Sequence, residues 1–176
     1  MLLKQALDTS EIFRNVLLKF LESVGSVLLD VGAEFDHYAA DISRTWAPKD
    51  NRRFNDVYQA VKDVTAYAMT QLKPGVTLRE YEKLVEVRMG EELKKLGLIK
   101  TASHEAIREY FPHATSHFMG IDVHDSGDYN QPLSEGVILT VEPGIYIPKE
   151  GIGVRIEDDV LIVEGGCKNL SVKVKR

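Results

Sequence analysis

The spacing of apolar residues along the chain predicts three helices of ordinary length. In each of these segments apolar side chains recur every three or four residues, which is the helical period. Two of the segments begin with a capping pair, Asp8 with Glu11 and Thr77 with Glu80. The pattern predicts helices over residues 8–24, 55–72 and 78–96, and one further short helix is expected near 104–110.

Between these helices the chain is rich in short apolar segments that are typical of strands. A hairpin is expected first, with strands over 27–31 and 34–46 and its turn at 32–36. Four more strands are expected near 119–124, 137–147, 153–163 and 168–174. Together the elements predict an α+β fold in which helices pack on one face of a curved antiparallel sheet.

Composition narrows the class of protein. A length of 176 residues suits one domain, and 44% hydrophobic with 28% charged residues is typical of a soluble globular chain. The net charge of −5 argues against nucleic acid as a partner, and the single cysteine, Cys167, excludes an internal disulfide. No window approaches the ~20 apolar residues of a membrane span, and the start of the chain lacks the apolar core of a signal peptide. The cytoplasm is therefore the expected compartment.

Candidate chemistry is concentrated in the stretch HATSHFMGIDVHD. It contains His113, His117 and His124, three of the five histidines of the chain. Imidazole is a common metal ligand and titrates near neutral pH. Four carboxylates lie in other apolar, strand-like segments: Asp30, Asp41, Glu142 and Glu157. A core rejects such groups unless a cation compensates them, so the pattern indicates a metal site.

At these residues the chain resembles the Xaa-Pro aminopeptidases and Xaa-Pro dipeptidases (prolidases), metallopeptidases of the pita-bread fold. The resemblance rests on LLDVGAEFDHYAADISRTW, HATSHFMGIDVHDSGDYNQPL, VILTVEPGIYIP and GIGVRIEDDVLI, which occur in the family's order between residues 26 and 176. It implies two halves, each with a helix pair and strands, and metal ions between them. Methionine aminopeptidases share that fold, but DVHDSGDYNQPL and GIGVRIEDD resemble the proline branch.

The resemblance also implies that the first half is shortened. Residues 1–25 correspond to the remnant of its first helix, 26–46 to its ligand hairpin, and 47–176 to a complete second half of a single catalytic domain. A second helix and an earlier hairpin with a substrate-binding histidine are missing. Apolar surface and a strand edge should then be exposed, so we expect a homodimer or higher oligomer and weak catalysis.

The resemblance assigns a role to each candidate ligand. It implies that Asp30 binds one metal ion, His117 and Glu142 bind a second, and Asp41 and Glu157 bridge the two. One imidazole with four carboxylates is an oxygen-rich set that suits Mn²⁺ or Co²⁺, with Zn²⁺ also acceptable. Glu142 is the candidate for moving a proton to the leaving nitrogen. Taken singly, an Asp at a strand end can be a turn former and Glu157 a solvated edge residue.

Three more residues complete the expected site. By resemblance, His113 and His124 line the substrate cleft and donate to the carbonyl oxygen, and Arg155 tethers the metal site or the substrate. As structural alternatives, His113 is a loop residue and Arg155 a counter-charge. The implied activity is hydrolysis of the bond between an N-terminal residue and proline in peptides. The alternative is a catalytically impaired domain that acts as a binding or structural protein.

Overall fold

The computed structural model describes residues 26–47 and 50–174. The helix expected over 8–24 lies outside these residues. In chain order the elements are β1 (Val27–Phe35), β2 (Tyr38–Trp46), α3 (Arg52–Gln71), α4 (Leu78–Lys95), α5 (His104–Tyr110), β3 (Ile138–Val141), β4 (Gly144–Ile147), the 3-10 turn η1 (Pro148–Glu150), β5 (Ile152–Arg155), β6 (Asp158–Val163) and β7 (Gly166–Asn169).

The helix α4 begins at its expected cap, Thr77, and α3 begins at Arg52, three residues before its expected start. The side chain of Asn51 accepts from the N–H of Phe54 in the first turn of α3. In α4 the capping box is complete, because Thr77 and Glu80 each accept from the other's backbone. The apolar stripes of both helices are buried or half-buried, and Leu84 of α4 is 43% exposed. The short α5 is also confirmed.

The β1–β2 hairpin turns later than the sequence suggested. Its turn is Asp36–His37, and both residues have positive φ, 54° and 66°. Gly32, expected at the start of the turn, lies inside β1 opposite Asp41. A Cβ at Gly32 would lie 2.6 Å from the carbonyl oxygen of Ala40, so this glycine permits a close approach of the two strands.

The remaining strands are shorter than expected because two of them break. The segment 137–147 divides into β3 and β4 at Glu142–Pro143, where proline offers no N–H for a ladder. The segment 153–163 divides into β5 and β6 at residues 156–157. Residues 119–124, expected to be a strand, form an irregular loop closed by hydrogen bonds such as Asp125 N–H to Phe118 O.

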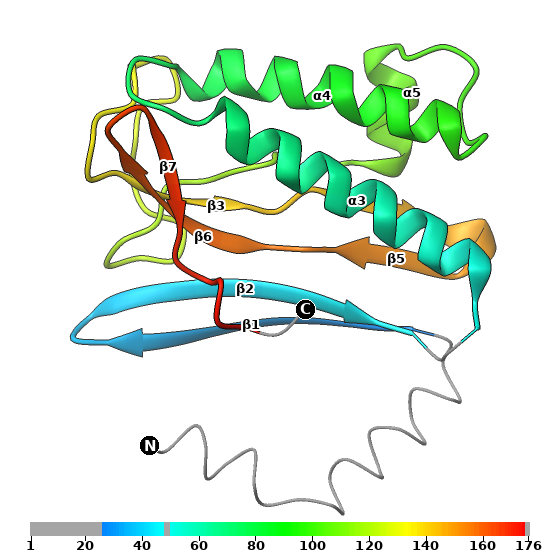
Figure 1. Ribbon diagram of the computed structural model, residues 1–176, viewed down its shortest axis with the longest axis horizontal. Helices are drawn as coiled ribbons and strands as arrows, with labels where there is room; N and C mark the ends of the chain where they lie inside the picture. Colours follow the sequence, from blue (N-terminus) through cyan, green and yellow to red (C-terminus); the bar gives the residue numbers. More distant parts are fainter. Residues whose placement is uncertain (1–25, 48–49, 175–176) are drawn as a thin grey trace, which may run out of the picture.

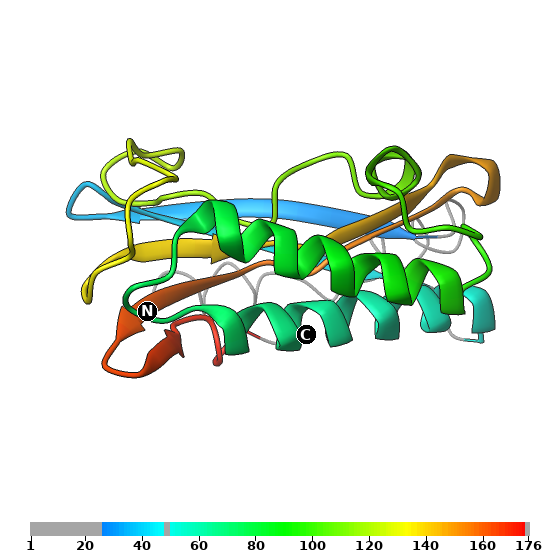
Figure 2. The same ribbon diagram turned by 90° about the horizontal axis from the view of Figure 1, so that it is seen from above.

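All strand pairs are antiparallel, in the order β1-β2, β3-β6-β7 and β4-β5. Figures 1 and 2 show α3 and α4 side by side along the strands, and the β1–β2 hairpin beyond β5 and β6, on the side away from α4. The core lies between α3, α4 and β3–β6, and includes Val57, Tyr81, Leu139 and Ile156. Within the described part of the chain, no helix has the length and hydropathy of a membrane span.

Candidate metal centre

The five residues expected as metal ligands meet in one cleft of about 450 Å³. Their donor atoms form overlapping groups in which all members lie within 4.8 Å of one another: His117, Glu142 and Glu157 in one, and Asp30, Asp41 and Glu157 in another. Nε2 of His117 lies 3.6 Å from Oδ2 of Asp41 and 3.6 Å from Oε1 of Glu142. The donors come from the β1–β2 hairpin, the two strand breaks, and the loop 113–124, which carries His113, His117 and His124 and is called the histidine loop below.

The register of the hairpin places its two aspartates on the same face. Asp30 pairs with Ser43, and Asp41 is two residues from Ser43 on the same strand. Residues two apart on a strand share a face, so Asp30, Asp41 and Ser43 all point toward the cleft. The hairpin is held there by two backbone bonds, from Ala39 N–H to Gly120 O and from Glu157 N–H to Ser43 O.

The two glutamates lie where the strands break, and their backbones are anchored there. The N–H of Glu142 donates to the carbonyl of Thr115 over 2.8 Å, which joins β3 to the histidine loop. The carboxylate of Glu157 accepts from Ser43 Oγ at 2.6 Å and is only 2% exposed. A strand break therefore turns each carboxylate into the cleft while its backbone stays hydrogen-bonded.

The orientation of His117 favours a metal ligand. Its Nδ1 lies 3.0 Å from the carbonyl oxygen of Phe118, and because a carbonyl can only accept, Nδ1 carries the proton. Nε2 then presents a lone pair toward Asp41 and Glu142, whose oxygens are also acceptors. When both carboxylates are ionised, all three facing groups are acceptors, and a bound cation would satisfy them. A backbone bond of this kind is typical of metal-binding histidines.

The carboxylates perturb one another's acidity. Burial, and next the charge of Glu157, raises the pKa of Glu142 to about 8. Burial, and next the charges of Asp41 and Asp30, raises the pKa of Glu157 to about 7 against the hydrogen bond from Ser43. The pKa of Asp41 is raised as well, by burial first and by Asp30 second. Crowded anions in a part-buried cleft are what a divalent cation stabilises, so these residues fit such an ion.

The second group of expected site residues forms a hydrogen-bonded row along one side of the cleft. Nδ1 of His113 donates to Ala114 O at 2.8 Å, so its Nε2 accepts from the hydroxyl of Tyr146 at 2.8 Å. Arg155 donates to the same hydroxyl at 3.2 Å and forms an ion pair with Asp30. Burial lowers the pKa of His113, which favours its neutral form.

His124 lies beside the ligand set. Its ring stacks edge-on against His117 with the centroids 4.4 Å apart, and its nitrogens fall within ligand range of Asp41 and His117. His124 therefore lines the cleft and also lies close enough to the ligand set to bind a metal ion.

Sequence reasoning missed several residues that hold the site. Tyr146 is two residues after Gly144, and a Cβ at Gly144 would lie 2.6 Å from the tyrosine hydroxyl. The glycine at position 144 was therefore the one sign in the sequence that this tyrosine packs closely there. Asp158 and Asp159 in IEDD are buried. Asp158 accepts from Arg44 at 2.6 Å, and Arg44 also donates to the carbonyl of Glu157 at 2.6 Å. This buried ion pair fastens β2 to β6 behind the ligands.

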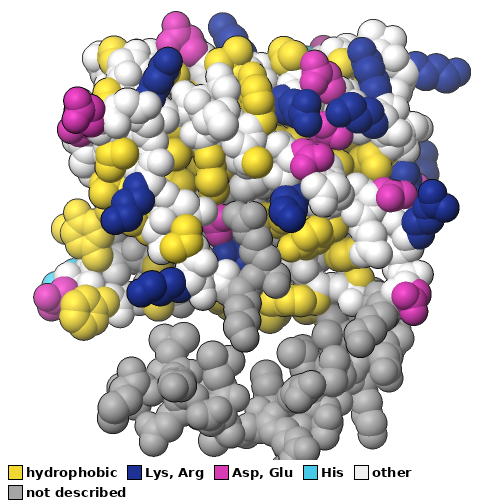
Figure 3. Space-filling view, in the orientation of Figure 1, with side chains coloured by type: hydrophobic (Ala, Val, Ile, Leu, Met, Phe, Trp, Pro, Cys, Tyr) yellow, Lys and Arg dark blue, Asp and Glu magenta, His cyan; other side chains and the backbone are white. Residues whose placement is uncertain are grey.

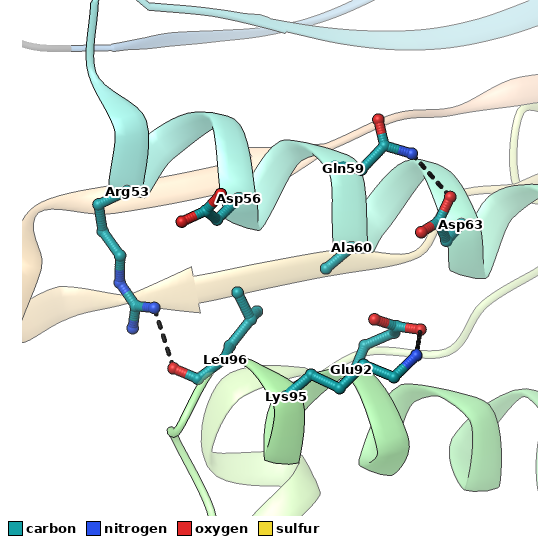
Figure 4. A pocket seen from close by; sticks show the side chains of 8 residues that line it. All are labelled: Arg53, Asp56, Gln59, Ala60, Asp63, Glu92, Lys95 and Leu96. Carbon is teal, nitrogen blue, oxygen red and sulfur yellow. Dashed lines mark hydrogen bonds and ion pairs between the residues drawn. The ribbon is translucent and has the colours of Figure 1, made fainter.

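A smaller hollow of about 250 Å³ lies between α3 and α4 (Figure 4). Figure 4 shows three contacts among its polar groups: Arg53 with Leu96 O, Gln59 with Asp63, and Glu92 with Lys95. Of these contacts, the bond from Arg53 to Leu96 O joins the two helices, and the other two lie within one helix each. The hollow contributes no group to the cleft.

Comparison with known proteins agrees with this geometry. Residues 10–164 match the model of Metallopeptidase family M24. The chain is 41% identical over 156 residues to Xaa-Pro aminopeptidase 3 of Rattus norvegicus, covering 78% of this chain and 30% of the relative. It is 38% identical over 167 residues to Xaa-Pro aminopeptidase of Escherichia coli, covering 84% of this chain and 38% of the relative. The chain therefore spans about a third of the length of these curated relatives.

A solved structure, described as zinc-substituted Escherichia coli aminopeptidase P in complex with product, superposes with a TM-score of 0.79. The match has 36% identity and covers 86% of this chain and 39% of that one. The expected α+β pita-bread fold is confirmed over the part of the chain that is covered.

Proposed function

Because the chain belongs to Metallopeptidase family M24, we propose that it hydrolyses the peptide bond between an N-terminal residue and proline with the help of bound divalent metal. The observation that carries the proposal is the lone pair of His117 facing the carboxylates of Asp41 and Glu142 at 3.6 Å. Relatives at about 40% identity are named Xaa-Pro aminopeptidases, which supports the substrate class.

The proposed ligands are Asp30, Asp41, His117, Glu142 and Glu157, with Asp41 and Glu157 between two ions. Members of this family use divalent metals, and the oxygen-rich set favours Mn²⁺ over Co²⁺ or Zn²⁺ in this chain. When bound, such ions supply Lewis acidity toward a peptide carbonyl and lower the pKa of water.

Glu142 is the proposed proton carrier. The proline nitrogen of an Xaa-Pro bond has no hydrogen and leaves poorly, so it needs a proton from a neighbouring acid. The Glu142 carboxyl lines the cleft, with one oxygen 3.6 Å from His117 and the other 3.8 Å from His113. Its backbone bond to Thr115 holds it in this position.

His113, His124 and Arg155 are proposed to hold the substrate. The hydroxyl of Tyr146 extends this set, because it bridges His113 and Arg155. A neutral His113 with its proton on Nδ1 accepts at Nε2. It can therefore donate to a substrate carbonyl only after it gains a proton or exchanges its tautomer.

The direct test measures metal content and hydrolysis together. The metal-free chain is titrated with Mn²⁺ by calorimetry and then assayed on an Xaa-Pro dipeptide and on a longer Xaa-Pro peptide. Glu142→Gln should lose hydrolysis of both peptides and bind Mn²⁺ more weakly. Glu34→Gln is the matched control, because Glu34 lies on the same face of β1 as Asp30 but does not line the cleft. It should change neither hydrolysis nor Mn²⁺ binding. A chain that binds no divalent metal would refute the proposal.

The same experiment distinguishes this peptidase from the alternative, a catalytically impaired domain that acts as a binding or structural protein. That reading predicts tight Mn²⁺ binding without turnover of either peptide. Turnover of the longer peptide but not the dipeptide would favour an aminopeptidase over a dipeptidase.

We propose further that the chain forms a homo-oligomer through the outer face of the β1–β2 hairpin. This face carries Leu29, Val31 and Phe35, which are exposed, and it contains an apolar groove of about 430 Å³. Figure 3 shows hydrophobic side chains gathered at the tip of the hairpin. Among described strands β1 pairs with β2 alone, so no described strand covers its other edge. Light scattering tests the oligomer. Val31→Lys should yield monomers, and a monomeric parent chain would contradict the proposal.

A cytoplasmic location is likewise proposed from the sequence. Fractionation of cells that produce the tagged chain tests it, and enrichment in membranes or in an organelle would contradict it.

A further inference from the structure

One carboxylate outside the cleft accepts hydrogen bonds from the loop that carries the histidines. Glu82 lies on α4, and its Oε1 accepts from the backbone N–H groups of Thr115 at 2.7 Å and Ser116 at 3.2 Å. Its Oε2 accepts from the hydroxyl of Thr115 at 3.0 Å. The hydroxyl of Ser116 in turn meets that of the fully buried Tyr81. Residues 115 and 116 are thus fixed to α4 through one side chain.

The opposite side of the same loop is bound to β3, where the proposed ligands are. Thr115 O accepts from the N–H of Glu142 at 2.8 Å, and the N–H of His117 donates to Oγ1 of Thr140 at 3.1 Å. Three consecutive residues, 115–117, therefore lie between α4 and β3. A displacement of this segment would shift His117 and the backbone of Glu142 together.

From this arrangement we infer that Glu82 is a positioning residue for the metal centre, an inference that rests on the proposed function. Thr115 and Ser116 are buried, so their N–H groups have no water to replace the carboxylate. Burial raises the pKa of the Glu82 carboxyl, and the hydrogen bonds from Thr115 and the charge of Arg108 oppose that rise. Glu82 does not line the cleft, so it acts through the loop rather than on substrate.

The neighbouring turn of α4 supports the same loop through Arg108. Glu86, one turn after Glu82, pairs with Arg108 at 3.2 Å, and Arg108 donates to the carbonyl of His113 at 2.6 Å. Two carboxylates on one face of α4 therefore hold the two ends of the segment 113–117, Glu82 directly and Glu86 through an arginine. In this way α4, which does not line the cleft, sets the positions of His113 and His117.

The test compares Glu82→Ala with Glu82→Gln in the whole chain. Gln keeps an oxygen that can accept both N–H groups, and the Thr115 hydroxyl can rotate to accept from its amide. Loss of partners that orient metal ligands weakens metal affinity about 10–100-fold. We expect Glu82→Ala to bind Mn²⁺ weaker by about that factor and Glu82→Gln to stay within a few-fold of the parent. Glu91→Ala, an exposed carboxylate of the same helix, is the control and should match the parent.

Hydrogen exchange of the metal-free chain gives a second readout that is independent of metal and of turnover. The amides of Thr115 and Ser116 should exchange at least ten-fold faster in Glu82→Ala, while core amides of α3 keep their rates. If Glu82→Ala does not fold, Thr115→Val, which removes one bond to the same carboxylate, should show a smaller acceleration at Ser116.

Unchanged exchange at these amides, or equal acceleration across α3, would overturn the inference. Parent-like Mn²⁺ affinity in Glu82→Ala would do the same. A parent chain without Mn²⁺ binding would refute the proposed function instead, and the exchange experiment would still decide the role of Glu82.

Discussion

Replacement of Glu157 by Gln tests whether the ionised ligand carboxylates destabilise the folded chain when no metal is bound. Glu157 is almost fully buried, and its pKa is raised from an ordinary value of 4.5 to about 7. The folded chain therefore binds more protons than the unfolded chain between pH 4.5 and pH 7. Stability must fall as pH rises through this window, because the slope of the unfolding free energy follows the difference in bound protons.

The size of the effect follows from the pKa values. At about 1.4 kcal/mol for each pH unit, a rise from 4.5 to about 7 corresponds to roughly 3 kcal/mol. Gln cannot ionise, yet its oxygen can still accept from Ser43. We therefore expect Glu157→Gln to match the parent chain near pH 5. At pH 8.5 without metal, the variant should be more stable than the parent by roughly 3 kcal/mol.

Urea unfolding in the presence of a chelator, at pH 5 and pH 8.5, measures this difference. Glu164→Gln, an exposed position just after β6, is the control and should follow the parent at both pH values. Added Mn²⁺ should reverse the order at pH 8.5 once it is present at about 1,000 times its Kd, where it stabilises the parent by about 4.1 kcal/mol. Parallel pH profiles for the variant and the parent would refute the electrostatic reasoning.

Three further changes test separate parts of the structure. Arg44→Met removes the buried guanidinium that pairs with Asp158 and should destabilise the chain by about 3–5 kcal/mol in urea unfolding, and a loss under about 1 kcal/mol would contradict the buried ion pair. Arg155→Ala removes donors to Tyr146 and Asp30 but no proposed ligand. Its turnover of Xaa-Pro peptides should fall while calorimetry shows most of the Mn²⁺ binding intact, and loss of binding would make Arg155 a support of the ligands instead. Thr77→Ala removes the helix cap of α4 and should cost about 1 kcal/mol by thermal unfolding, with no change in Mn²⁺ affinity.

Local signals in the sequence predicted the helices well because a helix cap acts within a few residues. The pair Thr77 and Glu80 marks the start of α4 and forms the complete capping box. The hairpin turn was misplaced for a non-local reason. Gly32 looks like a turn residue, but its missing side chain makes room for the carbonyl of Ala40 on the opposite strand. Only the register of the finished hairpin reveals that role.

The ligand set was expected from a resemblance, and the spacing of its members along the chain could not have placed them together. Glu142 and Glu157 fall inside segments that read as continuous strands. Their convergence depends on strand breaks, of which Pro143 was a visible signal and residues 156–157 gave none. The positions of Tyr146 and Glu82 depend on side-chain contacts between distant elements. Periodicity along the chain carries no information about such contacts.

The fold holds its crowded carboxylates by their backbones and leaves their side chains in the cleft. The N–H groups of Asp41, Glu142 and Glu157 are bound by Asp159, Thr115 and Ser43, so each of these ligand positions has a backbone anchor, beside the bond from Ser43 Oγ to the Glu157 carboxylate. The arginines nearby offset only part of the cluster's charge: Arg44 pairs with Asp158 behind it, and Arg155 pairs with Asp30 and lies 3.9 Å from the Glu157 carboxylate. The raised pKa values of Glu142 and Glu157 are the consequence. A divalent ion would therefore relieve a repulsion that the fold maintains, so metal affinity and folding stability should change together wherever these backbone anchors are weakened.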